Sequence, residues 1–166
     1  MYISIPPNGY TEFSEGVAVE FTKHDGTKWV GNLATGQSNL KFAAHLKNGN
    51  DVLIIASGIC YIIDPDNLLS FIEFGFNFHS VSEHKNSFIL VGKHAISIVE
   101  NRNSIIHFPD LSYDGIEVEK LENDKLYCVS RLFNSSYDFE ESKFVLDLNN
   151  KVIIKEYKVE WWKFWK

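Results

Sequence analysis

The 166-residue chain has little cysteine and no long apolar run. Its two cysteines, Cys60 and Cys128, lie inside apolar stretches, which predicts buried free thiols and argues against a disulfide framework or a cysteine metal site. No window approaches the roughly 20 apolar residues of a membrane span, and the start "MYISIPPNGY" lacks a basic region followed by an apolar one. We therefore expect a cytoplasmic protein with no membrane partner.

Positive charge is also scarce, because 16 Lys and Arg face 22 Asp and Glu, for a net charge of −6. Nucleic-acid binding through bulk electrostatics needs clustered Lys and Arg, so we expect no nucleic-acid partner. An acidic body attracts a basic partner. The alternative is that mild acidity only keeps the protein in solution.

Aromatic residues are abundant, with thirteen Phe, seven Tyr and four Trp beside many Ile and Val. These side chains fit the pleated, half-buried surface of a sheet. The apolar runs are short, and their spacing is close to two or continuous rather than 3.6, so little helix is expected. Composition and spacing together predict an all-β protein.

An apolar run that ends on an acid and turns through Asn occurs three times, at Asp64, Glu100 and Asp147. The acids are 36 and 47 residues apart, and the longer interval contains the polar insertion "RLFNSSYDFEESK" (131–143). Each repeat reads as four short strands joined by tight turns. The three repeats cover residues 42–74, 78–108 and 116–157.

A four-stranded antiparallel unit that recurs at this period is typical of a propeller blade. Three units are fewer than a closed propeller contains, so the sequence predicts a partial (half) β-propeller of about three four-stranded antiparallel units. One curved antiparallel sheet is the alternative. We expect a single domain over 1–166, made of an N-terminal hairpin region (1–40), the repeated units (41–157) and a Trp-rich tail (158–166).

The N-terminal hairpin is expected to cover one open edge of the repeated units. An open sheet edge invites pairing with another chain, which would allow a homodimer. The alternative is an edge blunted by Lys and Glu.

The chain resembles an uncharacterised family of small bacterial β-propeller-like proteins, over about residues 29–157. The family's Trp-x-Gly-Asn, Tyr-Ile-x-Asp-Pro and [Trp/Tyr]-Asp-Gly-Ile segments recur here in the same order. The segments that carry the resemblance are "WVGNLATG" (29–36), "GICYIIDPDN" (58–67), "SYDGI" (112–116) and "FVLDLNNKVI" (144–153). Tyr113 stands where the family tends to have Trp, and the tail has no counterpart. The resemblance implies the architecture and a bacterial origin, but no catalytic residue.

Motifs that carry catalysis are missing, among them the nucleophile elbow, the His-Glu-x-x-His helix and the phosphate-binding glycine loop. The six histidines are scattered, and the closest pair, His79 and His84, would point to opposite faces of a strand. Asp138 and Glu140 would lie on one face, whereas the two carboxylates of a glycosidase flank their substrate. We therefore expect no enzyme, no catalytic residue, no metal and no cofactor.

The insertion carries acids and aromatic residues together, which favours a partner-binding surface on a rigid scaffold. Acids steer a basic partner and aromatic rings anchor it. The alternative is a solvated hairpin tip without a role. The candidate residues are Tyr137, Asp138, Phe139, Glu140 and Glu141.

The tail "YKVEWWKFWK" (157–166) holds Trp161, Trp162 and Trp165, whose rings need a cover because exposure to water is costly. One expectation is that the tail docks over its own core as a lid. The other is that it anchors a partner, since Trp is favoured at interface hot spots. A base-stacking or membrane-interface segment is a further alternative.

The functional hypothesis is a non-enzymatic protein-binding protein, most concretely a bacterial immunity or inhibitor protein that neutralises a basic toxin such as a nuclease. The alternative is a small-ligand binding protein or enzyme that uses the open end of the β units. That alternative predicts that His45, His79, His94 and His107 converge on one pocket. A structural module of a larger assembly is a third hypothesis.

Overall fold

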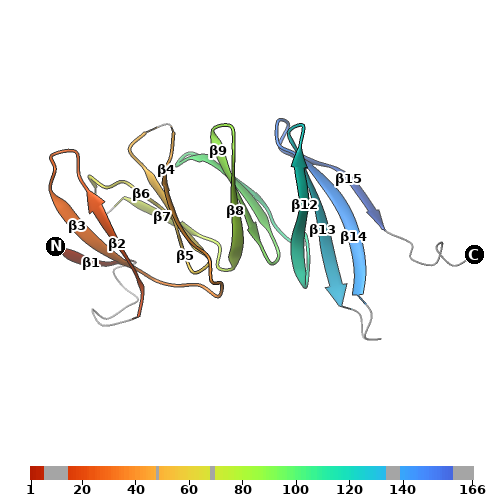
Figure 1. Ribbon diagram of the computed structural model, residues 1–166, viewed down its shortest axis with the longest axis horizontal. Helices are drawn as coiled ribbons and strands as arrows, with labels where there is room; N and C mark the ends of the chain where they lie inside the picture. The colour runs from red at the N-terminus through yellow and green to blue at the C-terminus, as the bar shows by residue number, and fades with distance from the viewer. Residues whose placement is uncertain (6–14, 48, 68–69, 134–138, 159–166) are drawn as a thin grey trace, which may run out of the picture. The chain divides into compact units, whose positions relative to one another are not determined.

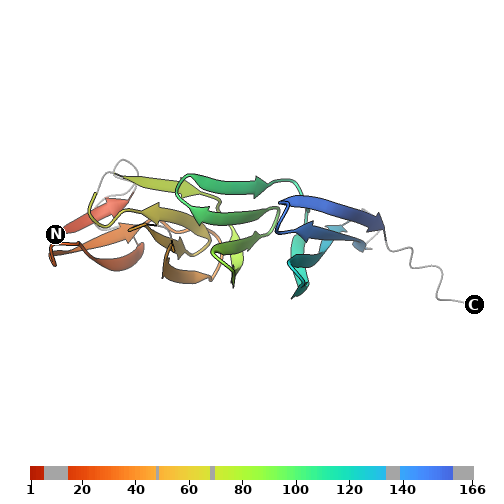
Figure 2. The same cartoon turned by 90° about the horizontal axis from the view of Figure 1, so that it is seen from above.

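A computed structural model describes residues 1–5, 15–47, 49–67, 70–133 and 139–158, with the backbone alone at 132–133, 139–140 and 155–158. Within these residues the chain is all-β, with fifteen strands and no helix (Figures 1 and 2). The strands are β1 (Tyr2–Ile5), β2 (Val17–Thr22), β3 (Lys28–Leu33), β4 (Lys41–His45), β5 (Val52–Ala56), β6 (Ile59–Ile63), β7 (Phe71–Phe74), β8 (Phe78–His84), β9 (Ser87–Gly92), β10 (Ile96–Asn101), β11 (Ser104–Phe108), β12 (Gly115–Glu122), β13 (Lys125–Phe133), β14 (Phe139–Asp147) and β15 (Val152–Lys158). The described part of the chain contains no helix with the length and apolar character needed to cross a membrane.

The strands form four separate sheets, none of them closed into a barrel. Three are the predicted four-stranded antiparallel units, β4–β7, β8–β11 and β12–β15, each with its strands in chain order. The prediction of an all-β fold is confirmed, and the sheets of three and four strands are consistent with a partial propeller. That the units are repeats of one another stays a prediction. The alternative of one curved sheet is wrong, because no strand pairing among the described residues joins the four sheets.

The chain divides into two compact units. The first contains residues 1–92 and 97–105, and the second contains residues 93–96 and 106–166. The first unit holds the sheets of β1–β3 and β4–β7 and most of β8–β11, and the second holds the sheet of β12–β15. That the whole chain folds as a single domain stays a prediction.

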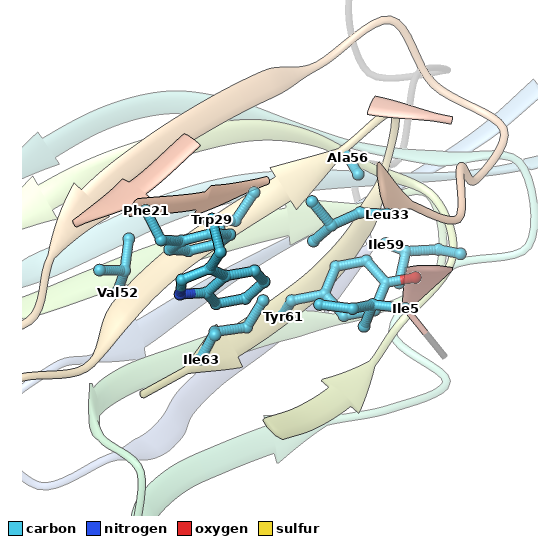
Figure 3. Close-up of a cluster of buried hydrophobic side chains, with 10 residues drawn as sticks. Ile5, Phe21, Trp29, Leu33, Val52, Ala56, Ile59, Tyr61 and Ile63 are labelled. Carbon is cyan, nitrogen blue, oxygen red and sulfur yellow. The ribbon is translucent and has the colours of Figure 1, made fainter. Parts of the chain in front are cut away.

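The sheet of β4–β7 is buried on both faces, which explains why β5 and β6 read as continuous apolar runs. Alternate residues point to opposite faces. Ile54 and Tyr61 pack against the sheet of β1–β3, and Figure 3 shows Tyr61 in this layer with Trp29. Their neighbours Leu53 and Ile62 pack against the sheet of β8–β11. The core of the first unit is therefore two apolar layers with one sheet between them.

The N-terminal region forms a three-stranded sheet of order β1-β3-β2, in which β1 runs parallel to β3. The expectation that this region covers a sheet edge is wrong, because it packs face to face on the sheet of β4–β7. Phe21 stacks on Trp29 with ring centroids 4.2 Å apart, and Trp29 Nε1 donates to the carbonyl of Pro65 at 2.9 Å. These apolar side chains alternate along β2 and β3, so the sheet has one apolar face to bury.

The acids that define the sequence repeat close the turns that follow them. Asp147 Oδ1 accepts the backbone N–H groups of Asn149 and Asn150 at 2.9 and 3.0 Å. In the first repeat Asp64 Oδ1 accepts the N–H of Asp66 at 3.0 Å. Glu100 instead accepts the hydroxyl of Ser104 across its hairpin at 2.7 Å. The repeated acids are thus explained by local turn chemistry.

Replacing Asp147 with Asn should make the free energy of unfolding less dependent on pH in the acidic range. Hydrogen bonds from the backbone and side chain of Asn150, and from Asn149, lower the pKa of Asp147 in the folded state. A lowered pKa stabilises the fold above the unfolded pKa of about 4 and loses that contribution as the pH falls through the folded value. Asp147→Asn should therefore lower the free energy of unfolding at pH 7, and the difference from wild type should shrink below about pH 4.

Urea unfolding of both proteins at several pH values measures this difference. Glu73→Gln, at an exposed acid on β7, is the control and should change stability little at any pH. A difference for Asp147→Asn that is the same at every pH would contradict the role assigned to the charged carboxylate.

Candidate functional site

The negative charge of the chain is concentrated in one segment of the second unit. Residues 110–147 contain ten Asp and Glu against four Lys and Arg, which equals the net charge of the whole chain. The remaining residues carry twelve charges of each sign. This segment runs from the loop before β12 to the end of β14. The acidity found by composition therefore gathers around β12–β14, whereas β15 of the same sheet adds Lys155, Glu156 and Lys158.

The predicted polar insertion at 131–143 is largely an extension of the β13–β14 hairpin. These two strands are nine residues long, and they remain paired as far as Phe133 opposite Phe139. Strands β5 and β6 of the first repeat have five residues each. The extra residues therefore lengthen a paired hairpin, and they place Arg131 opposite Glu141.

The sheet of β12–β15 has one apolar face and one charged face. The apolar face holds buried Ile116, Leu126, Cys128, Phe144 and Leu146. The opposite surface, here called the charged face, is made of Glu117, Glu119, Arg131, Glu141 and Lys143. Val129 lies between Glu117 and Lys143 in the register and is only 6% exposed, as expected where long charged side chains lie over an apolar one.

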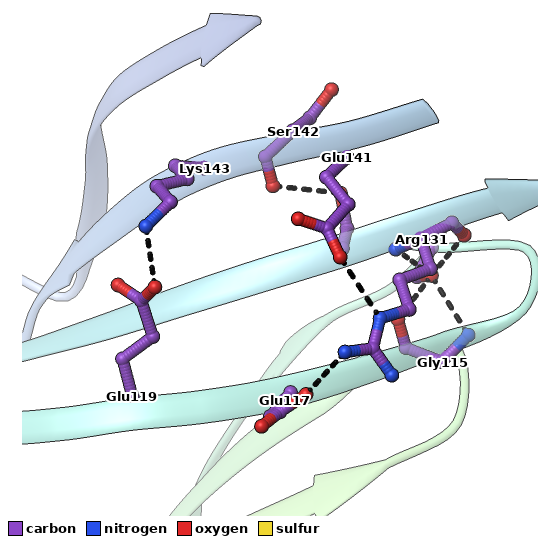
Figure 4. Close-up of polar contacts among 9 residues, drawn as sticks. Gly115, Glu117, Glu119, Arg131, Glu141, Ser142 and Lys143 are labelled. Carbon is purple, nitrogen blue, oxygen red and sulfur yellow. Dashed lines mark hydrogen bonds and ion pairs between the residues drawn. The ribbon is translucent and has the colours of Figure 1, made fainter. Parts of the chain in front are cut away.

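Ion pairs link the residues of the charged face across three strands (Figure 4). Arg131 Nη2 lies 2.7 Å from Glu117 Oε2, and Arg131 Nε lies 3.3 Å from Glu141 Oε1. Lys143 pairs with Glu119. Pairs as exposed as these contribute only about 0–1 kcal/mol each, since water and salt screen them. A partner can therefore exchange them at low cost.

Ser112 fixes the loop that leads into β12. Its Oγ accepts the backbone N–H groups of Gly115 at 3.0 Å and of Arg131 at 3.3 Å, and it lies 2.6 Å from the carbonyl oxygen of Gly115. The carbonyl of Ser112 also lies 3.0 Å from His94 Nδ1. Gly115 has a φ of +140°, which an L side chain rarely adopts. The Ser and Gly of the "SYDGI" segment thus have structural roles.

Tyr113 and Asp114 are the residues that this fixed loop presents to solvent. The side chain of Tyr113 is 76% exposed, although tyrosine usually buries its ring. The N–H of Asp114 donates to the carbonyl of Arg131 at 3.1 Å, so the loop is held against the edge of the charged face. An exposed ring on a rigid loop beside clustered acids has the composition of an interface anchor.

The sequence-predicted site is only partly within the described residues. Glu141 lies on the charged face and shares Arg131 with Glu117. Phe139 and Glu140 lie in β14, where only their backbone is described. The remaining predicted site residues lie outside the described part of the chain, namely Tyr137, Asp138, Trp161, Trp162 and Trp165.

Sequence reasoning missed Tyr113, Asp114 and Glu117 as site residues. The segment "SYDGI" was informative only as part of a family resemblance. Its turn chemistry is the signal that would have found them, because an aromatic residue between a capping Ser and Asp-Gly is poorly placed to enter a core. Glu117 required the cross-strand register, which pairs it with Val129 and so places it diagonally opposite Arg131, two residues further along β13.

Of the four histidines in the predicted pocket, only His45 lines the hollow that the structure describes. In the first unit, β2 and β4 flank a hollow of about 340 Å³ that is lined by His45, Glu20 and Phe21 among others. His79 lies on β8 and does not line this hollow, while His94 and His107 belong to the second unit. Among the described residues no group of three or more His, Cys, Asp or Glu side chains is placed to hold a metal ion.

Both cysteines are buried free thiols, as predicted. Burial raises the pKa of Cys60 well above its usual value. Burial, with a smaller contribution from Glu119, raises the pKa of Cys128 to about 12. Both thiols are therefore protonated at neutral pH and are poor nucleophiles.

Comparisons of the chain with protein-family models, curated proteins and solved structures find no match. The family resemblance inferred from the sequence segments therefore stays a prediction.

Replacing Ser112 with Ala should lower the free energy of unfolding by about 1–2 kcal/mol, because the N–H groups of Gly115 and Arg131 lose their acceptor. Ser130→Ala is the matched control. Ser130 is also a half-buried serine of this sheet, but its hydroxyl makes one long contact, 3.3 Å to the carbonyl of Ser142. The control should cost less than about 0.5 kcal/mol. Urea unfolding at pH 7 measures both, and equal costs would contradict the role of Ser112.

Proposed function

We propose that the chain is a non-enzymatic protein-binding protein that holds a basic protein partner against the charged face and Tyr113. In its most concrete form it is a bacterial immunity or inhibitor protein that neutralises a basic toxin such as a nuclease. One observation carries the proposal, which is the coincidence of the whole net negative charge with a solvent-exposed aromatic residue on a fixed loop.

The charges of this surface suit a cationic partner. Glu117 and Glu141 share the single guanidinium of Arg131, so each carboxylate keeps unused acceptor capacity. A Lys or Arg from a partner would add a second cation to these two acids. The surrounding negative charge would raise the rate of encounter, and this effect would weaken with salt.

Tyr113 would supply the contact energy that exposed charges do not. Exposed ion pairs contribute little, whereas tyrosine is enriched among residues that dominate binding. The Ser112 hydrogen bonds hold the loop before any partner arrives, so little conformational entropy is lost on binding.

A nuclease is the preferred kind of toxin because of charge complementarity. A nucleic-acid site needs clustered Lys and Arg to displace the counterions of its substrate. A sheet surface that carries Glu117, Glu119 and Glu141 presents anions to such a site. Covering the site with this surface would exclude the substrate without any chemistry on the part of the inhibitor.

Small-ligand binding is the second candidate function, and the hollow between β2 and β4 favours it. Its volume of about 340 Å³ is near the lower end of the range for small-molecule pockets. Phe21 is among its apolar lining residues, and Glu20 and His45 give it polar groups. If small-ligand binding is the function, no protein partner should bind the charged face.

A pull-down from lysate of the source organism tests the proposal with the full chain as bait. The wild-type chain should recover one basic protein in stoichiometric amount and should inhibit its activity in the purified pair. Tyr113→Ala should weaken the complex roughly 30-fold, which corresponds to about 2 kcal/mol. Glu117→Lys should mainly slow association and reduce its salt dependence.

Glu73→Lys makes the same charge change at an exposed site of the first unit and is the matched control, which should bind as wild type does. Recovery of a partner whose affinity is the same for wild type, Tyr113→Ala and Glu117→Lys would refute the assignment of binding to this surface. Recovery of no protein partner would favour the small-ligand function.

A further inference from the structure

Exposed apolar side chains gather at two edge strands. Seven large hydrophobic residues are exposed within the described part of the chain. Four of them lie on β1 and β15 or directly before β1, and their exposed fractions are 77% for Met1, 54% for Tyr2, 48% for Val152 and 50% for Ile154. Edge strands of soluble proteins are usually protected by charge or proline, because an apolar edge pairs with other strands.

The sheet of β1–β3 has one strand fewer than the other three sheets, and β1 is its edge (Figure 1). The carbonyls of Met1 and Ile5 accept the N–H groups of Val30 and Ala34 on the side of β3. Since successive residues of a strand point their backbone groups to opposite sides, the N–H and C=O groups of Tyr2 and Ser4 face the open side. No strand of the described residues pairs with them.

Two further features of β1 indicate that its open edge can pair with an added strand. Its sequence "YISI" contains no charged residue and no proline, which are the residues that blunt natural edges. The hydroxyl of Ser4 is buried and has no hydrogen-bond partner among the described residues. A strand laid against β1 would satisfy the backbone groups of Tyr2 and Ser4 and cover the ring of Tyr2.

Strand β15 is the complementary edge. It has seven residues and pairs only with β14 within the described residues. Its first three residues are apolar like β1, with Val152 and Ile154 exposed and Ile154 at a register shift of the pairing with β14, and its remaining residues include Lys155, Glu156 and Lys158. It is long enough to cover all four residues of β1.

We propose that β15 of one copy of the chain adds to β1 of a second copy and becomes the fourth strand of that sheet. Strand β15 carries Lys155, Glu156 and Lys158, so pairing of β15 with itself would bring two strands of net positive charge together, whereas β1 is uncharged. The two joined surfaces differ, so the contact is heterologous. In a joined pair, one copy keeps an unpaired β1 and the other keeps an unpaired β15. Further copies can therefore add, which leads to a ring or an open chain.

Two variants should each block one side of this contact. Ser4→Pro removes an N–H that faces the open side, so it spares the bonds between β1 and β3, and proline is tolerated on edge strands. Ile154→Lys places a charge on the exposed side of β15. Tyr2→Lys is a second variant of the acceptor side, in case proline disturbs β1. Phe76→Lys is the control, because Phe76 is 49% exposed but lies on no strand.

Sedimentation velocity of the full chain over a wide concentration range tests the proposal. Wild type and Phe76→Lys should form assemblies that grow with concentration, whereas Ser4→Pro, Tyr2→Lys and Ile154→Lys should each stay monomeric, with association weakened more than about tenfold. An equal mixture of Ser4→Pro and Ile154→Lys should form a dimer and nothing larger, because it contains one intact β15 and one intact β1 per pair.

Several results would overturn the proposal. A monomeric wild type at every concentration would show that β1 and β15 do not join copies. Self-association of Ser4→Pro and Tyr2→Lys would point to pairing of β15 with itself, and self-association of Ile154→Lys would point to pairing of β1 with itself. Loss of association in Phe76→Lys would indicate a general apolar contact. Thermal unfolding of each variant confirms that it is folded, so that loss of association is interpreted only for folded protein.

Discussion

The burial of the β4–β7 sheet on both faces is the constraint on which the first unit depends. Alternate residues of β5 and β6 enter two different apolar layers, so neither layer forms without this sheet. Tyr61 illustrates the arrangement, because its ring lies fully buried in one layer and its hydroxyl donates to the carbonyl of Ala34 at 3.1 Å. The three-stranded sheet of β1–β3 has a single apolar face, and this central sheet covers it.

The sheet of β12–β15 differs from the central sheet in a way that bears on function. It has the same four-stranded order, but one of its faces carries Arg131 and Glu141 on β13 and β14, whereas the corresponding strands β5 and β6 are apolar throughout. Stacking another sheet on that face would strip water from several charges, which costs more than their pairing returns unless each charge finds a partner. The charged face is therefore suited to a protein that brings complementary cations.

Much of the fold was predictable because its signals are local. The alternation of apolar residues and the turns after Asp64 and Asp147 place the strands of the repeated units close to their observed bounds. The missed strand, β1, pairs in parallel with β3 across more than twenty residues of sequence, and no local pattern reports such a contact. The pairing of Glu141 with Arg131 and the exposure of Tyr113 depend likewise on register and on a loop fixed by Ser112. The acidity of the site was visible in composition, but its location was not.

Hydrogen exchange of the chain, alone and with its captured basic partner, tests the central claim most directly. The account predicts that backbone amides in the Tyr113 loop and in β12, β13 and β14 become protected when the partner binds. Amides of β5 and β6 should be strongly protected in both states, because they lie between two apolar layers. Protection that appears only around β2 and β4, with no change near Tyr113, would contradict the account and place binding at the hollow of the first unit.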